Sequence, residues 1–177
     1  MKPKIVLIGG GGHGRVLIDA ILAQDKYEIV GFVDTALSIG SVISGNYKVV
    51  LNQNELHNLG DVADFFIIAI GNNLIREQIY NEAVKYCKAA IIIHPSATIC
   101  PNVAIEEGTV IMAKTFINTS CMIGINTIVN AGVIIDHDCK IGNHVHLSIG
   151  TLVGSRSVIA DKITTSIGQH INSFSNL

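Results

Sequence analysis

An aliphatic side chain recurs at every sixth position through the second half of this 177-residue chain. The series is unbroken through Ile99, Ile105, Ile111, Ile117, Ile123, Val129, Ile135, Ile141, Leu147, Val153 and Ile159. If aliphatic residues fill roughly a quarter of positions, chance gives such a run less than about once in a million trials. An α-helix cannot produce a strict period of six, because its turn holds about 3.6 residues. The repeat therefore favours a solenoid in this half of the chain.

A second series lies four residues after each aliphatic position and contains small or β-branched side chains. Its members are Val103, Thr109, Thr115, Cys121, Thr127, Val133, Cys139, Val145, Thr151, Ser157 and Ile163. The residue directly after the aliphatic position is often polar or glycine, as at Glu106, Asn118, Gly124, Asn130, Asp136, Gly142 and Gly154. We assign the turns to these positions, because such residues tolerate unusual backbone angles.

Six residues supply one flat face and one turn, and three such units close a triangular coil of about 18 residues. Both series point inward, and neighbouring coils pair through parallel strand hydrogen bonds. The pattern predicts a left-handed parallel β-helix with regular coils from Ala97 to about Ile163. The phase is expected to fail at Thr165, because the next Ile-Gly pair, Ile167-Gly168, comes two residues late.

The first half of the chain alternates short apolar strands with amphipathic helices. Strands are predicted over 4–9, 27–34, 64–70 and 89–93, and helices over 14–23 and 73–88. The continuous apolar run of the third strand suits a parallel strand that is buried on both faces. This order predicts a small Rossmann-like α/β domain. We place the two domains at residues 1–93 and 94–177, which meet at His94-Pro95.

A glycine-rich loop follows the first predicted strand and has the spacing GxGxxG, with Gly9, Gly11 and Gly14. Asp34 lies twenty residues beyond Gly14, which completes the formal dinucleotide-binding pattern. Glycines at this point let phosphates approach a helix N-terminus closely. Binding of NAD and a purely structural turn are both open, although four strands are too few for two full nucleotide-binding halves. Arg76 either pairs with a phosphate or lies on a helix surface.

Composition excludes several classes of function. The net charge is -2 without a basic run, so no nucleic-acid partner is expected. No apolar stretch reaches the roughly 18 residues of a membrane span, and the first apolar run is too short for a signal peptide. The four cysteines show no CxxC spacing and are interpreted as free thiols in a reducing cytoplasm, with Cys121 and Cys139 filling the core. No cluster has metal-ligand spacing, so no metal is expected.

His137 is the first candidate for chemistry in the repeat region. It lies two residues after the inward Ile135, so it is expected at or beside a corner of the prism, facing outward. Acyl transfer needs a base near neutral pH, and an imidazole suits that task. Asp138 follows directly, and a carboxylate near the ring would orient it and favour its protonated form. A solvated turn histidine is the alternative.

Five motifs taken together resemble bacterial sugar acyltransferases of the sialic acid O-acetyltransferase and UDP-bacillosamine N-acetyltransferase type. These are IGGGGHGRVLIDAI, GFVD, IIAIGNNLIRE, HPSA and NAGVIIDHDCKIGNHVHLS, and the resemblance covers residues 3 to about 160. It implies an acetyl-CoA-dependent transferase without a metal, which acetylates an amino or hydroxyl group of a nucleotide-activated sugar in surface glycan biosynthesis. A UDP-sugar is the expected substrate.

The resemblance also implies roles for individual residues. His137 is the general base, and Asp138 raises its basicity. His146 and Gly154 contact acetyl-CoA, although Ser155 competes with Gly154 for that position. His144 has no counterpart and is interpreted as a surface residue. The nucleotide sugar is expected near Gly11, Gly12, His13, Asp34, Thr35 and Gly71. By analogy of fold, the protein is expected to form a homotrimer with acetyl-CoA between neighbouring prisms.

Two departures from the family pattern keep other hypotheses open. Family members usually continue for about two further coils, and the segment HVHLSIGTLVGS is one residue shorter than usual before its glycine. The alternative is therefore a weak or inactive nucleotide-sugar-binding paralogue with a truncated β-helix. A small NAD-dependent enzyme is the third hypothesis. The sequence does not distinguish an amine from a hydroxyl acceptor.

Overall fold

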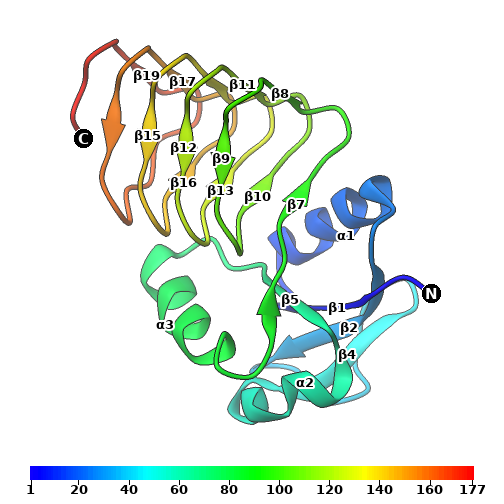
Figure 1. Cartoon of the computed structure of the whole chain (residues 1–177). Helices are drawn as coiled ribbons and strands as arrows, with labels where there is room; N and C mark the ends of the chain where they lie inside the picture. Colours follow the sequence, from blue (N-terminus) through cyan, green and yellow to red (C-terminus); the bar gives the residue numbers. More distant parts are fainter. The chain divides into compact units, whose positions relative to one another are not determined.

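The computed structural model describes all 177 residues, which form two compact units, Met1–Ala90 and Ile91–Leu177 (Figure 1). The first unit is α/β and the second is a left-handed parallel β-helix, so the predicted fold class is confirmed. None of the helices has the length and apolar character that a membrane span needs.

The first unit contains one six-stranded sheet with the order β3-β4-β2-β1-β5-β6. All pairs are parallel except β3 with β4. Both β2 and β5 flank β1, so the chain leaves the central strand first to one side and later to the other. The elements are β1 Lys4–Ile8, α1 Gly12–Gln24, β2 Glu28–Asp34, β3 Val42–Ser44, β4 Tyr47–Asn52, the 3₁₀ helix η1 Gln53–Asn58, α2 Leu59–Val62, β5 Phe65–Ile68, α3 Asn73–Ala83 and β6 Lys88–Ala89.

The strand expected over 89–93 is divided between the two units. Lys88–Ala89 forms β6 and pairs with β5, whereas Ile92–Ile93 forms β7 and pairs with β10 of the β-helix. The apolar run is continuous, so the prediction merged the two strands. Ile93 lies six residues before Ile99 and thus already belongs to the six-residue series.

The second unit consists of two-residue strands in three parallel sheets, ordered β16-β13-β10-β7, β19-β17-β14-β11-β8 and β18-β15-β12-β9. Each strand pairs with the strand 18 residues away, as Ile117 does with Ile135. The strands are β7 Ile92–Ile93, β8 Thr98–Ile99, β9 Ala104–Ile105, β10 Val110–Ile111, β11 Phe116–Ile117, β12 Met122–Ile123, β13 Ile128–Val129, β14 Ile134–Ile135, β15 Lys140–Ile141, β16 His146–Leu147, β17 Leu152–Val153, β18 Val158–Ile159 and β19 His170–Ile171.

Both inward series form the core of the prism, as predicted. The small polar members of the second series, except Thr151, donate hydrogen bonds to backbone carbonyls of the next coil. Thr109 Oγ1 donates to the Gly124 carbonyl at 2.8 Å, and Cys121 Sγ donates to the Asp136 carbonyl at 3.0 Å. Cys121 and Cys139 are free and fully buried, which confirms that they fill the core. A hydroxyl or thiol is tolerated in the core because it has an acceptor there.

The turns differ from the prediction. Left-handed backbone conformation occurs at the third residue after the aliphatic position, from Asn102 to Phe174, and not at the first. Glycine at the first position meets a different constraint, the closeness of the neighbouring coil. A Cβ on Gly142 would lie 2.7 Å from the Asp161 backbone nitrogen and 2.5 Å from its Oδ1. The glycines there provide space between coils, while the left-handed angle falls two residues later.

The coils continue beyond Ile163, so the prediction that the repeat ends there is wrong. Thr165 occupies the aliphatic slot with 3% exposure and accepts a hydrogen bond from the Ser148 backbone N–H at 2.8 Å. Ile171 follows in phase and pairs through β19 with Val153 of β17. Ile167, which suggested a phase error, is an outward residue with 78% exposure. The hydrogen-bonded hydroxyl of Thr165 interrupts the aliphatic series in the sequence, although the six-residue period continues in the structure.

The β-helix core predicts a matched pair of stability effects in β14. Ile135 is fully buried, whereas its neighbour Ile134 is 45% exposed. We expect Ile135→Ala to lower the free energy of unfolding by about 2–5 kcal/mol, because it leaves a cavity between stacked coils. Ile134→Ala should cost less than about 1 kcal/mol. Urea unfolding monitored by circular dichroism measures both, and equal losses would contradict the inward assignment of the series.

Candidate active site

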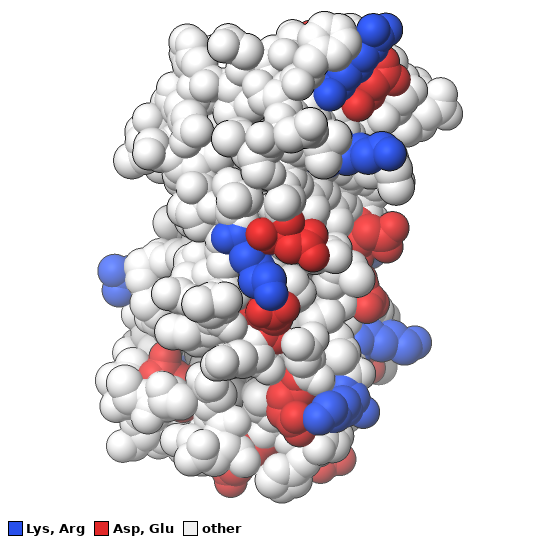
Figure 2. All heavy atoms as spheres, turned by 90° about the vertical axis from the view of Figure 1, so that its left-hand side faces the viewer, with Lys and Arg blue, Asp and Glu red and all other residues white.

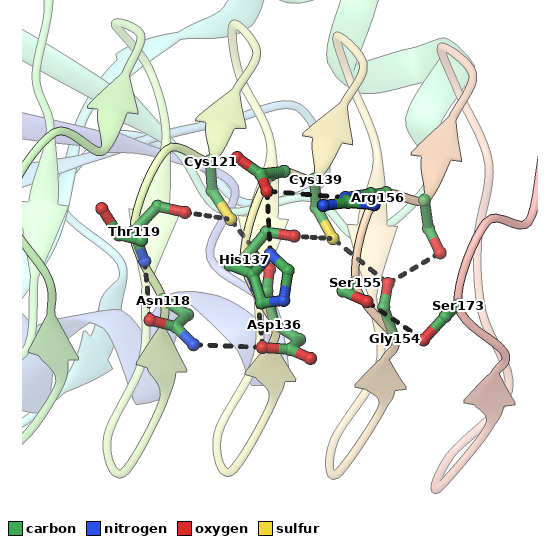
Figure 3. A network of polar contacts seen from close by, with 12 residues as sticks. Asn118, Thr119, Cys121, Asp136, His137, Cys139, Gly154, Ser155, Arg156 and Ser173 are labelled. Carbon is green, nitrogen blue, oxygen red and sulfur yellow. Dashed lines mark hydrogen bonds and ion pairs between the residues drawn. The ribbon is translucent and has the colours of Figure 1, made fainter.

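One edge of the prism carries the candidate catalytic residues. The corner from Asp136 to Cys139 joins β14 to β15, and the equivalent corners of the neighbouring coils stack on it (Figure 3). The second residue of the corner is Thr119, then His137, then Ser155 in three successive coils. His137 thus lies in the middle of a stacked edge and faces outward, where the sequence placed it.

His137 forms a pair with the residue that follows it. Its Nδ1 lies 2.8 Å from Asp138 Oδ2, and both side chains are partly exposed. A carboxylate at Nδ1 favours the tautomer that carries its proton there and leaves Nε2 as the acceptor nitrogen. Figure 3 shows this second ring nitrogen of His137 on the side of Ser155. The imidazole is therefore oriented to accept a proton from outside the prism.

Asp138 has a second charged neighbour in the next coil. Arg156 Nε lies 3.8 Å from Asp138 Oδ2, and the guanidinium stands 5.5 Å from the centre of the Phe174 ring. The left-handed positions 138, 156 and 174 follow one another at intervals of 18 residues along the edge, so their side chains emerge in a column. The Arg156–Asp138 pair is exposed, and a pair of this kind contributes little to stability.

The backbone amides of this edge have different partners from coil to coil. Asn118 Oδ1 accepts the Thr119 N–H, and Asp136 Oδ1 accepts the His137 N–H, both at 2.8 Å. The corresponding position in the next coil is Gly154, which has no side chain, and the Ser155 N–H has no acceptor in the protein. Gly154 is required by space, because its Cβ would lie 2.5 Å from the Ser173 backbone nitrogen. An unsatisfied amide therefore lies one coil from His137.

A groove of about 420 Å³ borders this edge on the side of β14 and β17. Its lining combines apolar strand residues with polar corner residues: Ile134, Asp136, Leu152, Val153, Gly154, His170, Ile171, Asn172 and Ser173. Asp136 and Gly154 thus line one groove, and His137 and Ser155 are the residues that directly follow them in the chain. The groove is open to solvent and can take an extended ligand along the strands.

His146 lies on another face of the prism, in β16. Its Nε2 is 3.5 Å from Asn130 Nδ2, and β16 belongs to a different sheet from β14, which precedes His137. His144 is not a surface residue, so that prediction is wrong. It has 8% exposure, a left-handed backbone, and its Nδ1 lies 3.0 Å from Asn126 Nδ2 of the preceding coil. His144 is therefore packed at a corner of the prism, in contact with the preceding coil.

The first unit contains a cleft of about 390 Å³ at the carboxyl ends of β1, β2 and β5. Parallel sheets bind ligands at this place, where strands leave the central strand in opposite directions. All six predicted substrate residues line it, together with Gly9, Gly10, Ala36, Gln53, Ala69 and Ile70. Sequence reasoning missed Gln53, which follows β4, because the strands β3 and β4 were not predicted.

Asp34 holds the loops of this cleft by accepting backbone hydrogen bonds. Its Oδ2 accepts the Gly10 N–H at 2.8 Å, and its Oδ1 accepts the N–H groups of Ala36 at 2.8 Å and Leu37 at 3.2 Å. Both oxygens are therefore engaged, which disfavours the ribose contact that the NAD hypothesis assigns to this carboxylate. Gly11 and Gly12 have open space where a side chain would stand, so a ligand can approach the start of α1.

Arg76 fits neither of its predicted roles. It is fully buried and donates to the carbonyls of Ile70 at 3.1 Å and Gly71 at 3.0 Å, and to Asn73 Oδ1 at 2.8 Å. Burial lowers the pKa of Arg76 to about 10. The side chain fixes the loop after β5 from inside, so it shapes the cleft without reaching a ligand in it.

The visible face of the molecule carries charges of both signs, and the structure contains no group of metal ligands. Figure 2 shows basic and acidic side chains close to one another on the visible face, with no stripe of one sign. No group of three or more His, Cys, Asp and Glu residues in the structure could hold a metal ion.

The sequence is similar to a known protein family and to curated proteins. The model of the PglD N-terminal domain family matches residues 4–83. The UDP-N-acetylbacillosamine N-acetyltransferase of Bacillus subtilis is 34% identical over 116 residues, and the match covers 62% of this chain and 51% of that protein. The chain therefore spans about half the length of the curated relative that it matches.

Solved structures match nearly the whole chain. The acetyltransferase domain of PglB from Neisseria gonorrhoeae is 32% identical with a TM-score of 0.74, over 99% of this chain and 88% of that domain. PerB from Caulobacter crescentus, solved with CoA and GDP-perosamine, is 28% identical with a TM-score of 0.72, over 98% of this chain and 84% of PerB. The PglB domain has also been solved with acetyl coenzyme A.

Proposed function

Because this chain belongs to the family of bacterial sugar acyltransferases with a PglD-type N-terminal domain, we propose that it transfers the acetyl group of acetyl-CoA to an amino group of a nucleotide-activated sugar. The observation that carries the proposal is the His137–Asp138 pair, with its outward Nε2 beside a groove. The Bacillus subtilis relative is an N-acetyltransferase, and PerB was solved with CoA and GDP-perosamine, which supports the amine as acceptor.

The proposed reaction is a direct transfer. The amine nitrogen attacks the thioester carbonyl, and His137 Nε2 takes one of its protons as the bond forms. Asp138 stabilises the imidazolium through Nδ1. The tetrahedral intermediate then collapses, the carbon–sulfur bond breaks, and the imidazolium returns the proton to the CoA sulfur. No covalent enzyme intermediate is needed, and the buried Cys139 plays no part.

The Ser155 N–H is proposed as the donor that stabilises the oxyanion. It lies one coil from His137 and has no acceptor in the protein, whereas the equivalent amides at Thr119 and His137 are bonded to side chains. A fixed amide that points at developing negative charge accelerates acyl transfer. In this assignment Gly154 lines the acetyl-CoA groove, and its lack of a side chain leaves the amide of Ser155 available.

The cleft of the first unit is proposed to bind the nucleotide. Gly11, Gly12 and His13 open α1, where the amides attract phosphate, and Asp34, Thr35 and Gly71 border the same space. One relative acts on a UDP-linked sugar and another was solved with a GDP-linked sugar. We propose UDP as the nucleotide, and a role of the acetylated sugar in surface glycan biosynthesis.

A homotrimer is proposed to complete the acetyl-CoA site. His137 and His146 lie on different parts of the prism, so one acetyl-CoA meets both only when they come from neighbouring copies. Outward apolar side chains on one face, Met122 and Val158, suit burial between prisms. Sedimentation velocity should give a trimer of the 18.9 kDa chain. A monomer at micromolar concentration would contradict this assembly.

The base assignment predicts that His137→Ala abolishes acetyl transfer and leaves nucleotide-sugar affinity nearly unchanged. General base catalysis contributes about 10²–10⁴-fold in rate, so the loss should be at least of that order. Release of the CoA thiol measures transfer, and calorimetry with UDP-sugars, acetyl-CoA and NADH measures binding. Retained activity would contradict the role of His137. A wild-type chain that binds UDP-sugar but not acetyl-CoA would instead indicate a nucleotide-sugar-binding paralogue, and binding of NADH alone would indicate a small NAD-dependent enzyme.

The oxyanion assignment predicts different effects for two substitutions of one residue. Ser155→Pro removes the amide hydrogen, and the fold accepts proline at this corner position, since Pro101 occupies it in an earlier coil. We expect kcat to fall about 10²–10³-fold, the usual effect of losing one oxyanion donor. Ser155→Ala keeps the amide and should stay within a few-fold of wild type. Equal effects of the two variants would rule out the amide.

A further inference from the structure

Asp136 precedes His137, and its two carboxylate oxygens have different surroundings. Oδ1 accepts a hydrogen bond from Asn118 Nδ2 at 3.0 Å and from the His137 backbone N–H at 2.8 Å. Oδ2 has no hydrogen-bond donor in the protein. Two donors on one oxygen fix the plane of the carboxylate, so the other oxygen has a defined direction.

The free oxygen belongs to the groove beside the catalytic edge. Asp136 lines that groove together with Gly154 and Ser173. Figure 3 shows the second oxygen of Asp136 on the same side of the corner as Ser155 and the outward ring nitrogen of His137. A nucleophile that approaches this nitrogen from the groove therefore lies beside the carboxylate.

The carboxylate is charged at neutral pH. The hydrogen bond from the His137 backbone lowers the pKa of Asp136, burial opposes it, and the bond from Asn118 and the charge of His137 lower it further, so that the pKa lies below its usual value. A charged oxygen accepts a hydrogen bond more strongly than a neutral one. No side chain of the protein donates a hydrogen bond to Oδ2.

We propose that Asp136 recognises the amine of the acceptor sugar, with Oδ2 accepting one N–H while His137 Nε2 takes the other hydrogen. The assignment rests on the acetyl transfer proposed above. A neutral amine carries two hydrogens and can contact both groups at once. A hydroxyl carries one, so when it donates to His137 it presents only lone pairs to the carboxylate, and the two oxygens repel each other. Asp136 thereby favours an amine over a hydroxyl.

Asp136→Asn is the sharpest test, because asparagine already stands at this corner position in the preceding coil, at Asn118, and two coils later, at Asn172. Asn118 Oδ1 accepts the following amide, so the variant retains the turn and offers an NH₂ group where Oδ2 was. We expect kcat/KM for the nucleotide amino sugar to fall about 10–100-fold, mainly through KM, since a charge-assisted hydrogen bond is lost. The KM for acetyl-CoA should stay within about twofold.

Asp161→Asn is the matched control. Like Asp136, Asp161 accepts a backbone N–H with its Oδ1. The donor is Asn143 in the preceding coil, at 2.7 Å, and Asp161 lies on another edge of the prism. Its kinetics should equal those of wild type, and thermal unfolding should verify that both variants fold. The wild-type protein should have a higher kcat/KM for the amino sugar than for its hydroxyl counterpart. Asp136→Asn should reduce the ratio of these two values.

Two further outcomes separate this inference from the proposed function. Unchanged amine kinetics in Asp136→Asn would overturn the role of Asp136 while acetyl transfer stands. A wild-type protein that acetylates neither the amine nor the hydroxyl sugar would overturn the proposed function itself, and the assignment of Asp136 with it.

Discussion

Parallel backbone hydrogen bonds between successive coils are the interaction on which the rest of the β-helix depends. Asn118 N donates to the Ile135 carbonyl and Asp136 N donates to the Val153 carbonyl, each at 2.9 Å. Because the register is 18 residues in every sheet, equivalent residues stack directly on one another. The stacked aliphatic core, the inward hydroxyls and thiols, and the column of left-handed corners all follow from this one spacing.

The same spacing assembles the candidate site from three corners. Asn118 in one coil fixes Asp136 in the next, His137 follows Asp136, and Ser155 supplies an amide one coil further on. No long loop positions these groups, so little reorganisation is needed when charge develops beside them. The first unit uses a comparable principle, because Asp34 and Arg76 hold the loops of its cleft through backbone atoms.

The sequence predicted what depends on periodicity and missed what depends on individual contacts. The six-residue series identified the fold and placed His137 on an outer corner. It failed at Thr165, since a hydroxyl bonded to its neighbours replaces an aliphatic side chain there. The role of Arg76 could not be predicted, because its acceptors are carbonyls and an asparagine side chain that carry no charge signal. Gln53 enters the cleft only through β4, whose pattern was not recognised.

The stacked corners also bear on how such a site can arise and change. Each coil presents the same short corner on the same backbone, and its amide is either bonded to a side chain, as at Thr119, or left open, as at Ser155. A mutation at one corner changes the local chemistry while the adjoining coils preserve the scaffold. A prism of this kind is therefore an array of equivalent sites, in which new activities can be sampled one edge at a time without a new fold.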